Sequence, residues 1–457
     1  MTYRVSIVGT GYVGLCTAVG FASKGCKVIT ATHDAGKAGS INRGIPPFFE
    51  PGLQELLHKV VRNGYLKCVV HCEEAVLETD ITFITTATPS QPTGSIDLQH
   101  IESSAREIGE ALNKKNGYHL VVVKSTVTPG TTQNIVKRTI EKHSNKLCGV
   151  DFGLCMNPEF LREGSALQDT LFPDRIIIGE HDRKSGDTLE ALYQDFYGGK
   201  KPPTMKTNLP TAELIKYANN AFLATKISFI NFVANICEKI PGVDVTTISK
   251  AIGMDKRIGP LFLNAGLGYG GSCLPKDVNA LIAFSKSLSY DPSFLKAVGA
   301  VNNVQPQRTV SLAKKHLGKL KGKQIAILGL SFKPNTDDMR KAKSIPIIRQ
   351  LLKEGASITA YDPVAIEKAK SILKDKIKYA SSPTECLKDA DCCIIATEWD
   401  EFKKLKPRDF KQNMRHPILI DGRRIYPPKQ FSQKLEFEAI GLGQTVLETP
   451  TKKLHGN

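Results

Sequence analysis

The stretch Val5-Ser6-Ile7-Val8-Gly9-Thr10-Gly11-Tyr12-Val13-Gly14 begins with an apolar strand that leads into the pattern Gly-x-Gly-x-x-Gly. A helix-like segment and a second apolar strand follow, over residues 15–31. Such a strand, helix and strand around this pattern are typical of a dinucleotide-binding fold. Gly9 makes the tight turn, Gly11 lets a pyrophosphate approach the backbone, and Gly14 lets helix and strand pack closely. The stretch therefore predicts a doubly wound α/β domain that binds a dinucleotide.

Apolar runs further along the chain extend this first domain. Residues 81–84, 120–124 and 175–178 are expected to be strands of the same sheet, with ligand-binding loops at their carboxyl ends. Pro202-Pro203 interrupts the pattern, and Thr211 has the residue type that caps a helix N-terminus. The chain then stays helical in character to about residue 317, which predicts a separate helical part.

A second α/β part begins after this helical part. The strand at residues 325–330 ends like the first one, but Ser331-Phe332-Lys333-Pro334 stands where the glycine pattern would be. The run at residues 392–397 parallels that at residues 81–86, so this part is expected to be a degenerate copy of the first. The fold class is therefore two Rossmann-like doubly wound α/β domains joined by a helical central domain. The expected boundaries are 1–200, 201–318 and 319–445, with a disordered tail at 446–457.

The composition is that of a water-soluble globular protein. The chain has 457 residues, 41% of them hydrophobic and 23% charged, which suits two or three domains. No signal peptide and no apolar run long enough to span a bilayer are recognised, so no membrane association is expected. Eleven scattered cysteines indicate a reducing compartment rather than disulfides. Neither Cys-x-x-Cys pairs nor histidine clusters suggest a metal. We expect a cytoplasmic protein without a metal ion.

The strong positive charge indicates anionic partners. The formal net charge is +17 and the isoelectric point is near 9.3. Nucleic acid is not expected, because no aromatic and basic interleaving and no nucleic-acid module are found. Much of the lysine excess lies in helix-like stretches such as residues 313–316 and 369–374, where solvated faces are the ordinary explanation. Small phosphorylated ligands remain the better match to the charge.

A glycine-rich segment at residues 263–277 carries the strongest indication of chemistry. It places Cys273 at the end of the loop, just before Pro275, which suits the first turn of a helix. The dipole and unpaired N–H groups of such a turn favour negative charge, so a thiol there should ionise readily and act as a nucleophile. Asp277 follows four residues later and shares one helix face with it. The alternative is a cysteine packed under a flexible loop.

A second candidate pair lies on the helix expected after residue 211. Lys216 and Asn220 are spaced i, i+4, so they can flank one oxygen atom together. A cation with an amide donor would stabilise negative charge developing on that oxygen. The alternative is a lysine whose stem covers apolar surface beside a polar residue.

Together these segments resemble the UDP-glucose/GDP-mannose dehydrogenase family of nucleotide-sugar 6-dehydrogenases, and within it the UDP-glucose branch. The resemblance extends from Val5 to about Tyr426. The motifs that carry it are Gly9-Thr10-Gly11-Tyr12-Val13-Gly14, Lys124-Ser125-Thr126-Val127, Asn157-Pro158-Glu159-Phe160-Leu161-Arg162-Glu163-Gly164, residues 216–220, the cysteine loop, Phe332-Lys333-Pro334-Asn335-Thr336-Asp337-Asp338-Met339-Arg340 and Asp421-Gly422-Arg423-Arg424.

The resemblance implies a two-step oxidation of the sugar C6 alcohol to a carboxylate. An aldehyde has no carbinol hydride to give, and a thiolate solves this by adding to it. The thiohemiacetal then loses hydride, and water cleaves the resulting thioester. Cys273 matches the family nucleophile, and Glu159 matches the residue implicated in thioester hydrolysis. Asp277 and Thr126 are expected to hold a water that takes part in proton transfer. These residues, with Lys216 and Asn220, form the expected catalytic set.

The resemblance also implies the binding residues. NAD is the expected cofactor and UDP-glucose the expected substrate, and two reduced cofactors form per sugar. The cofactor residues would be Gly9, Gly11, Tyr12, Val13, Gly14, Thr32, Lys37, Thr88, Thr126, Glu163 and Arg340. The substrate residues would be Glu159, Phe160, Leu161, Lys216, Asn220, Arg257, Asn264, Tyr269, Gly270, Phe332, Lys333 and Arg423. In the family the arginine matched by Arg257 reaches the neighbouring subunit's site, which implies at least a homodimer.

One departure from the family pattern concerns the choice of cofactor. NAD enzymes place an acidic residue at the end of the second strand, where it binds the adenosine ribose hydroxyls. Here Thr32 stands at that position. It supplies no charged acceptor and no repulsion against a 2′-phosphate, while His33 and Lys37 could attract one. NAD is the expected cofactor, and NADP is an open alternative unless Asp34 substitutes for the missing acid.

Three alternative functions remain open from the sequence. The same chemistry could act on another nucleotide sugar, such as GDP-mannose or UDP-N-acetylmannosamine. A one-step hydroxyacid dehydrogenase of similar architecture also uses a lysine and an asparagine on one helix, but it has no need of Cys273. A non-catalytic dinucleotide sensor would be expected to lose the nucleophile or the lysine, and both Cys273 and Lys216 are present.

Overall fold

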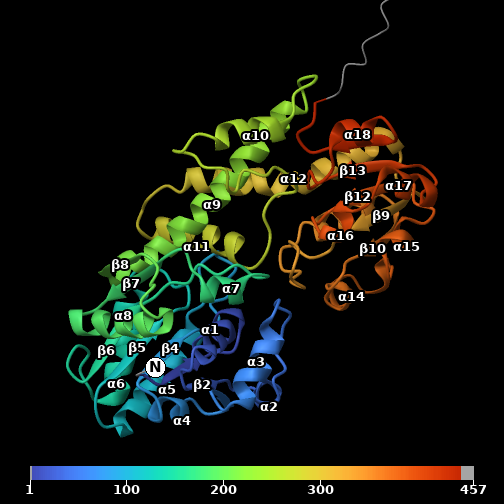
Figure 1. Cartoon of the computed structure of the whole chain (residues 1–457). Coiled ribbons are helices and arrows are strands. Elements are labelled where there is room, and N and C mark those ends of the chain that lie inside the picture. Colours follow the sequence, from blue (N-terminus) through green and yellow to red (C-terminus); the bar gives the residue numbers. More distant parts are fainter. Residues whose placement is uncertain (1–2, 444–457) are drawn as a thin grey trace, which may run out of the picture. The chain divides into compact units, whose positions relative to one another are not determined.

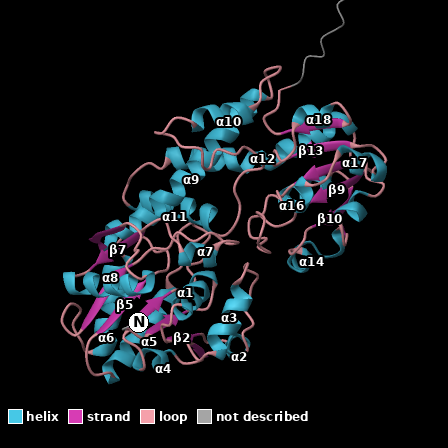
Figure 2. Cartoon of the chain, in the orientation of Figure 1, coloured by secondary structure: helices cyan, strands magenta, loops and turns pink. Residues whose placement is uncertain are grey.

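The computed structural model describes residues 3–443. The chain forms two compact units. The first consists of Met1–Ala221 with Lys276–Asp291, and the second of Phe222–Pro275 with Pro292–Asn457. Each contains one β-sheet with helices around it (Figures 1 and 2).

The first unit is built on an eight-stranded sheet in the order β3-β2-β1-β4-β5-β6-β7-β8. Neighbouring strands are parallel except β6 and β7. The order of β1 to β6 is that of a doubly wound dinucleotide-binding sheet. The strands are β1 (Val5–Val8), β2 (Val28–Ala31), β3 (Leu66–Val69), β4 (Ile81–Ile84), β5 (His119–Val123), β6 (Phe152–Met156), β7 (Ile176–Glu180) and β8 (Thr204–Asn208).

Helices cover both faces of this sheet, which is why its strands are continuous apolar runs. Ile7 and Val122 pack into one buried cluster, and Val8 and Val123 pack into another. The helices of this unit are α1 (Tyr12–Ser23), α2 (Ala35–Asn42), α3 (Leu53–Arg62), α4 (Cys72–Leu77), α5 (Gln99–Lys114), the π-helical η1 (Thr132–Val136), α6 (Lys137–Ser144), α7 (Ala166–Leu171) and α8 (Arg183–Tyr197).

Two helices belong partly to each unit: α9 (Leu209–Cys237) and α11 (Cys273–Ser287). The prediction that Thr211 caps α9 is wrong, because the helix begins at Leu209. The side chain of Asn208 accepts the Thr211 N–H at 2.9 Å instead. The other helices of the middle part are α10 (Val245–Gly253) and α12 (Ser293–Leu317).

The expectation that no segment is long and apolar enough to span a bilayer is wrong for α9. Its 29 residues reach a mean hydropathy of 1.2 over an 18-residue window, of which 44% is buried inside the protein. Core helices of soluble proteins meet the same criterion. Glu213 and Lys216 on α9 are buried and bound to protein groups, as expected for a helix of a folded domain.

The second unit has a six-stranded parallel sheet in the order β11-β10-β9-β12-β13-β14. This repeats the order of β1 to β6, so the expectation of a second, degenerate copy is confirmed. Its strands are β9 (Gln324–Leu328), β10 (Ser357–Tyr361), β11 (Lys378–Tyr379), β12 (Cys392–Ile395), β13 (Ile418–Asp421) and β14 (Glu436–Ala439). Its helices are α13 (Ser344–Lys353), α14 (Ile366–Leu373), the 3-10 helix η2 (Lys374–Lys376), α15 (Pro383–Leu387), α16 (Asp400–Lys403), α17 (Pro407–Asn413) and α18 (Pro428–Ser432).

The compact units divide the chain at other positions than the three predicted domains. β8 lies beyond residue 200 and pairs with β7 in the first sheet. The predicted helical part contributes to both units through α9 and α11. The predicted tail at residues 446–457 lies outside the described residues. The three-domain division therefore stays a prediction.

Candidate active site

The turn between β1 and α1 has the geometry that a dinucleotide phosphate requires. Gly9 has a φ of 109°, and a Cβ added to Gly14 would lie 2.0 Å from the Gly9 oxygen. A Cβ added to Gly11 would meet nothing within 4 Å. Among the described residues, no side chain caps the N-terminus of α1. The turn thus fits an anion approaching the backbone at a helix N-terminus.

Three further expected cofactor residues follow β1 and β4. Tyr12 stacks on Phe48 with the ring centroids 3.9 Å apart. Val13 is half-buried in the first turn of α1. Thr88 is buried, and its hydroxyl donates to the Thr126 oxygen at 3.0 Å. These contacts join the loops that follow β4 and β5.

The carboxyl end of β2 carries opposite charges in pairs. Thr32 follows the strand, and Asp34 caps α2 by accepting the Lys37 N–H at 2.9 Å. The Lys37 ammonium lies 3.6 Å from the other Asp34 oxygen. The His33 ring nitrogen lies 3.3 Å from Glu107. Both basic residues expected near a 2′-phosphate therefore face a carboxylate of the protein.

A buried ion pair joins two of the expected catalytic residues in the first unit. The Lys216 ammonium on α9 lies 2.9 Å from the Glu159 carboxylate and donates to the Glu159 backbone oxygen at 2.7 Å. The second carboxylate oxygen accepts the Leu161 N–H at 2.6 Å. Both side chains are at most 8% exposed. Removing either partner of such a pair costs about 3–5 kcal/mol, because the other charge stays buried.

A second buried pair lies one turn further along α9. The Asn220 amide donates to one oxygen of Asp277 at 2.6 Å, and the Lys276 ammonium donates to the other at 2.6 Å. Asn220 and Asp277 are buried. The expected spacing of Lys216 and Asn220 on one helix is confirmed by the bounds of α9. The first unit thus gathers a lysine, an amide and two carboxylates around the end of β6.

Phe160 and Arg175 extend this cluster. The Arg175 guanidinium stacks on the Phe160 ring at 3.9 Å, and the Lys216 ammonium lies 5.4 Å from the same ring. Leu161 and Glu163 continue the loop and are half-buried. The loop that the sequence predicted to touch the sugar is thus held by cation–π contacts.

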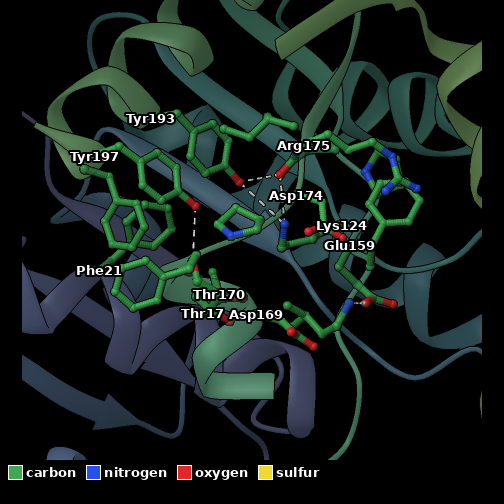
Figure 3. Close-up of a pocket in the computed structure, with 18 of the residues that line it drawn as sticks. Thr17, Phe21, Lys124, Glu159, Asp169, Thr170, Asp174, Arg175, Tyr193 and Tyr197 are labelled. Carbon is green, nitrogen blue, oxygen red and sulfur yellow. Dashed lines mark hydrogen bonds between the residues drawn. The ribbon is translucent and has the colours of Figure 1, made fainter. Parts of the chain in front are cut away.

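A cavity of about 100 Å³ lies beside the cluster (Figure 3). Its lining includes Glu159 and three residues that we did not predict as site residues, Lys124, Asn157 and Tyr193. Lys124 donates to the Asn157 side-chain oxygen at 2.9 Å, and the Tyr193 hydroxyl donates to the same oxygen at 2.5 Å. Burial lowers the pKa of Lys124 to about 8, opposed by the charge of Glu159 and assisted by that of Lys216.

The second unit carries the cysteine loop. Cys273 is the first residue of α11, and Pro275 lies in the first turn, as the sequence predicts. All eleven cysteines lie within the described residues, and Cys273 alone among them is exposed. Burial raises the pKa of others, as for Cys148 and Cys72, to about 12. Exposure and position thus single out Cys273 as the accessible thiol.

The loop before Cys273 is packed against residues 332–343. The Gly271 N–H donates to the Arg340 oxygen at 2.9 Å. A Cβ added to Gly271 would lie 2.7 Å from the Phe332 ring, and one added to Gly270 would lie 2.6 Å from the Lys341 oxygen. The Tyr269 backbone is held by the Asn302 amide through bonds of 2.7 and 3.1 Å. Side chains larger than hydrogen would separate these segments.

The remaining predicted residues differ in exposure. Arg423 is mostly buried and donates to the Ala396 oxygen at 2.8 Å and the Phe332 oxygen at 3.3 Å. Lys333 is half-buried, and its ammonium lies 5.5 Å from the Phe332 ring. Asn264 is exposed. Arg257 and Arg340 are exposed and pair with Asp255 and Asp338. The structure thus brings Gly270, Phe332 and Arg423 together in the second unit.

No group of three or more His, Cys, Asp or Glu side chains that could hold a metal is found within residues 3–443.

These features define an oxidoreductase that works on a nucleotide-linked substrate. They are two nucleotide-binding sheets, an uncapped glycine turn, a lysine and an asparagine on one helix, and an exposed cysteine at the start of another helix. Residues 3–197 match the NAD binding domain of the UDP-glucose/GDP-mannose dehydrogenase family, residues 210–304 its central domain and residues 326–428 its UDP binding domain. The chain belongs to this family. The expected family and fold class are confirmed, as are NAD as cofactor and a UDP-sugar as substrate.

Similar proteins carry the same domains over their whole length. The UDP-glucose 6-dehydrogenase AglM of Haloferax volcanii is 44% identical over 438 residues, which cover 96% of this chain and 100% of that protein. TuaD of Bacillus subtilis, also a UDP-glucose 6-dehydrogenase, is 42% identical over 93% of this chain and 89% of that protein. The structure of a UDP-glucose dehydrogenase from Pyrobaculum islandicum is 40% identical in sequence and superposes with a TM-score of 0.89. The match covers 97% of this chain and 98% of that chain.

Proposed function

We propose that the protein oxidises the C6 alcohol of UDP-glucose to the carboxylate of UDP-glucuronate, with two NAD consumed per sugar. The observation that carries the proposal is the make-up of α11. This helix begins at the exposed Cys273, and one turn later it carries Asp277, which is hydrogen-bonded to Asn220. A one-step dehydrogenase needs no accessible thiol, whereas an accessible thiol provides a covalent route for oxidising an aldehyde to an acid.

The first oxidation forms an aldehyde. As the C6 hydroxyl loses its proton, Lys216 and Asn220 donate to the developing negative charge on the oxygen. Their burial strengthens this interaction, because little water competes for the oxygen. The bound cofactor supplies the hydride acceptor for this oxidation and for the next one. Asp277 is the partner of a water that takes part in proton transfer.

The second oxidation proceeds on the enzyme's sulfur. The Cys273 thiolate adds to the aldehyde carbon, and the oxygen takes up a proton to give a thiohemiacetal. Loss of hydride and of the hydroxyl proton leaves a thioester. A water, held by Thr126 and deprotonated by Glu159, adds to the thioester carbon. The carbon–sulfur bond then breaks, which releases the carboxylate and regenerates the sulfur nucleophile.

The cofactor residues follow from the β1–α1 turn. The backbone at Gly9, Gly11 and Gly14 would hold the pyrophosphate, with Tyr12, Val13, Thr88, Thr126, Glu163 and Arg340 around the remainder. We assign NAD rather than NADP as the preferred cofactor, although Thr32 replaces the usual acid. The support is that Lys37 and His33 face Asp34 and Glu107, so a 2′-phosphate would meet neutralised cations and nearby carboxylates.

The proposed nucleotide-sugar residues are those that the family resemblance implies. Lys333 and Arg423 supply positive charge for the diphosphate. Phe332, Tyr269, Gly270 and Asn264 would enclose the nucleotide and sugar, and Phe160 and Leu161 would contact the sugar. We favour UDP-glucose over another nucleotide sugar because relatives with 38–44% identity are UDP-glucose 6-dehydrogenases. A dehydrogenase of UDP-D-ManNAc from Pyrococcus horikoshii is only 28% identical.

The functional assembly is proposed to be at least a homodimer in the cytoplasm. The part of α9 in the second unit exposes Phe222, Phe229, Phe232 and Ile236, each more than 40% exposed. Their spacing places them along one side of the helix. Exposed apolar stripes of this kind are typical of interfaces. In the assembly, Arg257 would reach the substrate site of the neighbouring subunit. Sedimentation velocity of the purified protein tests this, and a monomer at micromolar concentration would contradict it.

The central experiment assays the purified protein with UDP-glucose and either cofactor. UDP-glucuronate and about two reduced cofactors per sugar are expected, because the thioester route removes two hydrides. A ratio near one would support the one-step alternative. Turnover of GDP-mannose or UDP-N-acetylmannosamine above that of UDP-glucose would reassign the substrate. A kcat/KM with NADP at or above that with NAD would reverse the cofactor assignment.

The variant Cys273→Ser tests the nucleophile. It should lose turnover by about a thousandfold or more, while UDP-glucose binding measured by calorimetry stays within a few fold. Cys148→Ser is the matched control, because Cys148 is a half-buried thiol of the first unit. Full oxidation to UDP-glucuronate by Cys273→Ser would contradict the assigned role.

A further inference from the structure

Lys124 is a buried lysine that no step of the proposed reaction uses. It follows the last residue of β5 and is 8% exposed. Its ammonium donates to the Asn157 side-chain oxygen at 2.9 Å and contacts the Tyr193 hydroxyl at 3.5 Å. Both of these oxygens are neutral. Neither of these hydrogen-bond partners is a carboxylate, which is the usual partner of a buried lysine. Lys124 is therefore poised to lose its proton.

The cavity beside Lys124 connects it with Glu159. Both residues line the same space of about 100 Å³ (Figure 3). A space of this volume is large enough to hold water. The Asn157 oxygen, the Tyr193 hydroxyl and the Glu159 carboxylate give such waters hydrogen-bond partners. The cavity therefore provides a hydrated connection from the Glu159 carboxylate to the Lys124 amine.

The protein also couples the two groups directly. Asn157 holds Lys124, and its amide donates to the Ile177 oxygen at 2.8 Å. Two residues later, Glu159 pairs with Lys216. The charge of Glu159 favours the charged form of Lys124, and that of Lys216 disfavours it. Lys124 is therefore a stronger base while Glu159 is ionised, which is the state that Glu159 regains once it has passed its proton on.

Other ionisable groups face the same cavity. Burial raises the pKa of the Tyr193 hydroxyl well above its usual range, so it stays neutral. Burial also raises the pKa of Tyr197. Asp169 on α7 pairs with Arg162, and Asp174 and Arg175 precede β7. Burial lowers the pKa of Lys124 to about 8. Lys124 can therefore act as a base at mildly alkaline pH.

We propose that Lys124 accepts a proton from Glu159 through the cavity. This proton is the one that Glu159 takes from water when the thioester is hydrolysed, so Lys124 acts through Glu159 and does not touch the substrate. This inference rests on the proposed function. In that step the water O–H bond breaks, a carbon–oxygen bond forms and the carbon–sulfur bond breaks. One water proton stays on the new carboxyl group and passes to the departing Cys273 sulfur. The other goes to the Glu159 carboxylate, and from there to the neutral Lys124 amine. Lys124 then returns it to solvent, and no electron is gained or lost.

Two variants of Lys124 test the inference. The wild-type kcat should rise with pH through about 8, because only the neutral amine accepts a proton. Lys124→Arg stays charged throughout this range, and Lys124→Met has no base. In both variants kcat at pH 9 should fall at least about tenfold and lose its rise near pH 8. Binding of UDP and NAD should stay within twofold.

Rapid mixing separates this role from a structural one. Both hydride transfers precede hydrolysis, so the variants should form two NADH per active site in a burst and then turn over slowly. A variant with damaged packing would show a smaller burst. If neither variant folds, the wild type at pH 6.5 gives the same test, since its hydrolysis should then be slow enough to reveal the burst.

Lys115→Met is the matched control. Burial also lowers the pKa of Lys115 to about 8, but it contacts Val76, Thr79 and His119 and does not line the cavity. It should keep the wild-type pH profile. The inference is overturned if Lys124→Arg keeps the rise near pH 8 or if the wild type shows no burst at pH 6.5. If either of these results is found while the wild type still oxidises UDP-glucose, the proposed function remains intact. A wild type without this activity overturns both the proposed function and the role of Lys124.

Discussion

The two sheets share one strand order but use the turn after their first strand in different ways. In the first unit, Gly9 packs against Thr85, and α1 begins without a side-chain cap. In the second unit, Gly329 packs in the same way against Thr397. Here, however, the carboxylate of Asp362 occupies the turn and accepts the Leu330 and Ser331 N–H groups at 2.7 and 3.0 Å.

The acidic residue after the second strand explains this difference. Dinucleotide-binding domains use that residue to bind ribose. In the second unit Asp362 stands at the end of β10 but is 1% exposed. It also accepts from Trp399, Val364 and Ala365. In the first unit the same position is Thr32, and the turn is left for a ligand. In the second unit this carboxylate therefore accepts hydrogen bonds from the protein itself instead of from a ligand.

The largest effect should come from removing this internal carboxylate. Asp362→Ala leaves several buried donors without an acceptor, so the free energy of unfolding should fall by about 4 kcal/mol. Urea denaturation of the full chain measures it. Asp34→Ala, which removes only the cap of α2, should cost about 1 kcal/mol. Equal losses in the two variants would show that Asp362 is an ordinary cap.

The next effect concerns which turn binds the dinucleotide. In Gly14→Val the added side chain would overlap the Gly9 oxygen, so NAD affinity should fall by about a hundredfold. Calorimetry with UDP should show little change. Lys333→Met is the reciprocal control, because UDP affinity should fall by about tenfold while NAD affinity is kept. If Gly14→Val weakened UDP as much as NAD, the division of ligands between the sheets would be contradicted.

The smallest effect is expected from a substitution that restores the missing acidic residue after β2 of the first sheet. Thr32→Asp should raise the ratio of kcat/KM for NAD over NADP by roughly fivefold, because a carboxylate accepts from the ribose hydroxyls and repels a 2′-phosphate. Steady-state kinetics with both cofactors measure the ratio. The control is Thr32→Asn, because asparagine has the shape of aspartate but no charge. It should change the ratio less than Thr32→Asp does. An unchanged ratio in Thr32→Asp would place the ribose away from the end of β2.

The sequence predicted the parts of the fold that have strong local patterns. The glycine turn and the apolar runs of β1, β4 and β5 were recognisable alone. β3, β6 and β8 were not predicted. β6 contains a glycine and a cysteine, and β8, at the edge of the sheet, has Met205 as its one apolar residue. Their pairing is decided by tertiary contacts that local propensity does not contain.

The candidate site was predictable where spacing along one helix carried the chemistry. Lys216 and Asn220 are one turn apart, and their burial follows from α9. The network of Lys124, Asn157 and Tyr193 was not predicted. Its members come from three elements, each has an ordinary explanation alone, and only folding brings them together. The lysine directly after an apolar strand was the one available signal.

The exposure of a single thiol also has a practical consequence. Ten of the eleven cysteines are buried or half-buried, and Cys273 opens α11 at the surface. A brief treatment of the native protein with a maleimide would therefore attach one label per chain. Because the label sits on the proposed nucleophile, the same reaction would count functional centres in a preparation, and a bound nucleotide sugar should slow it.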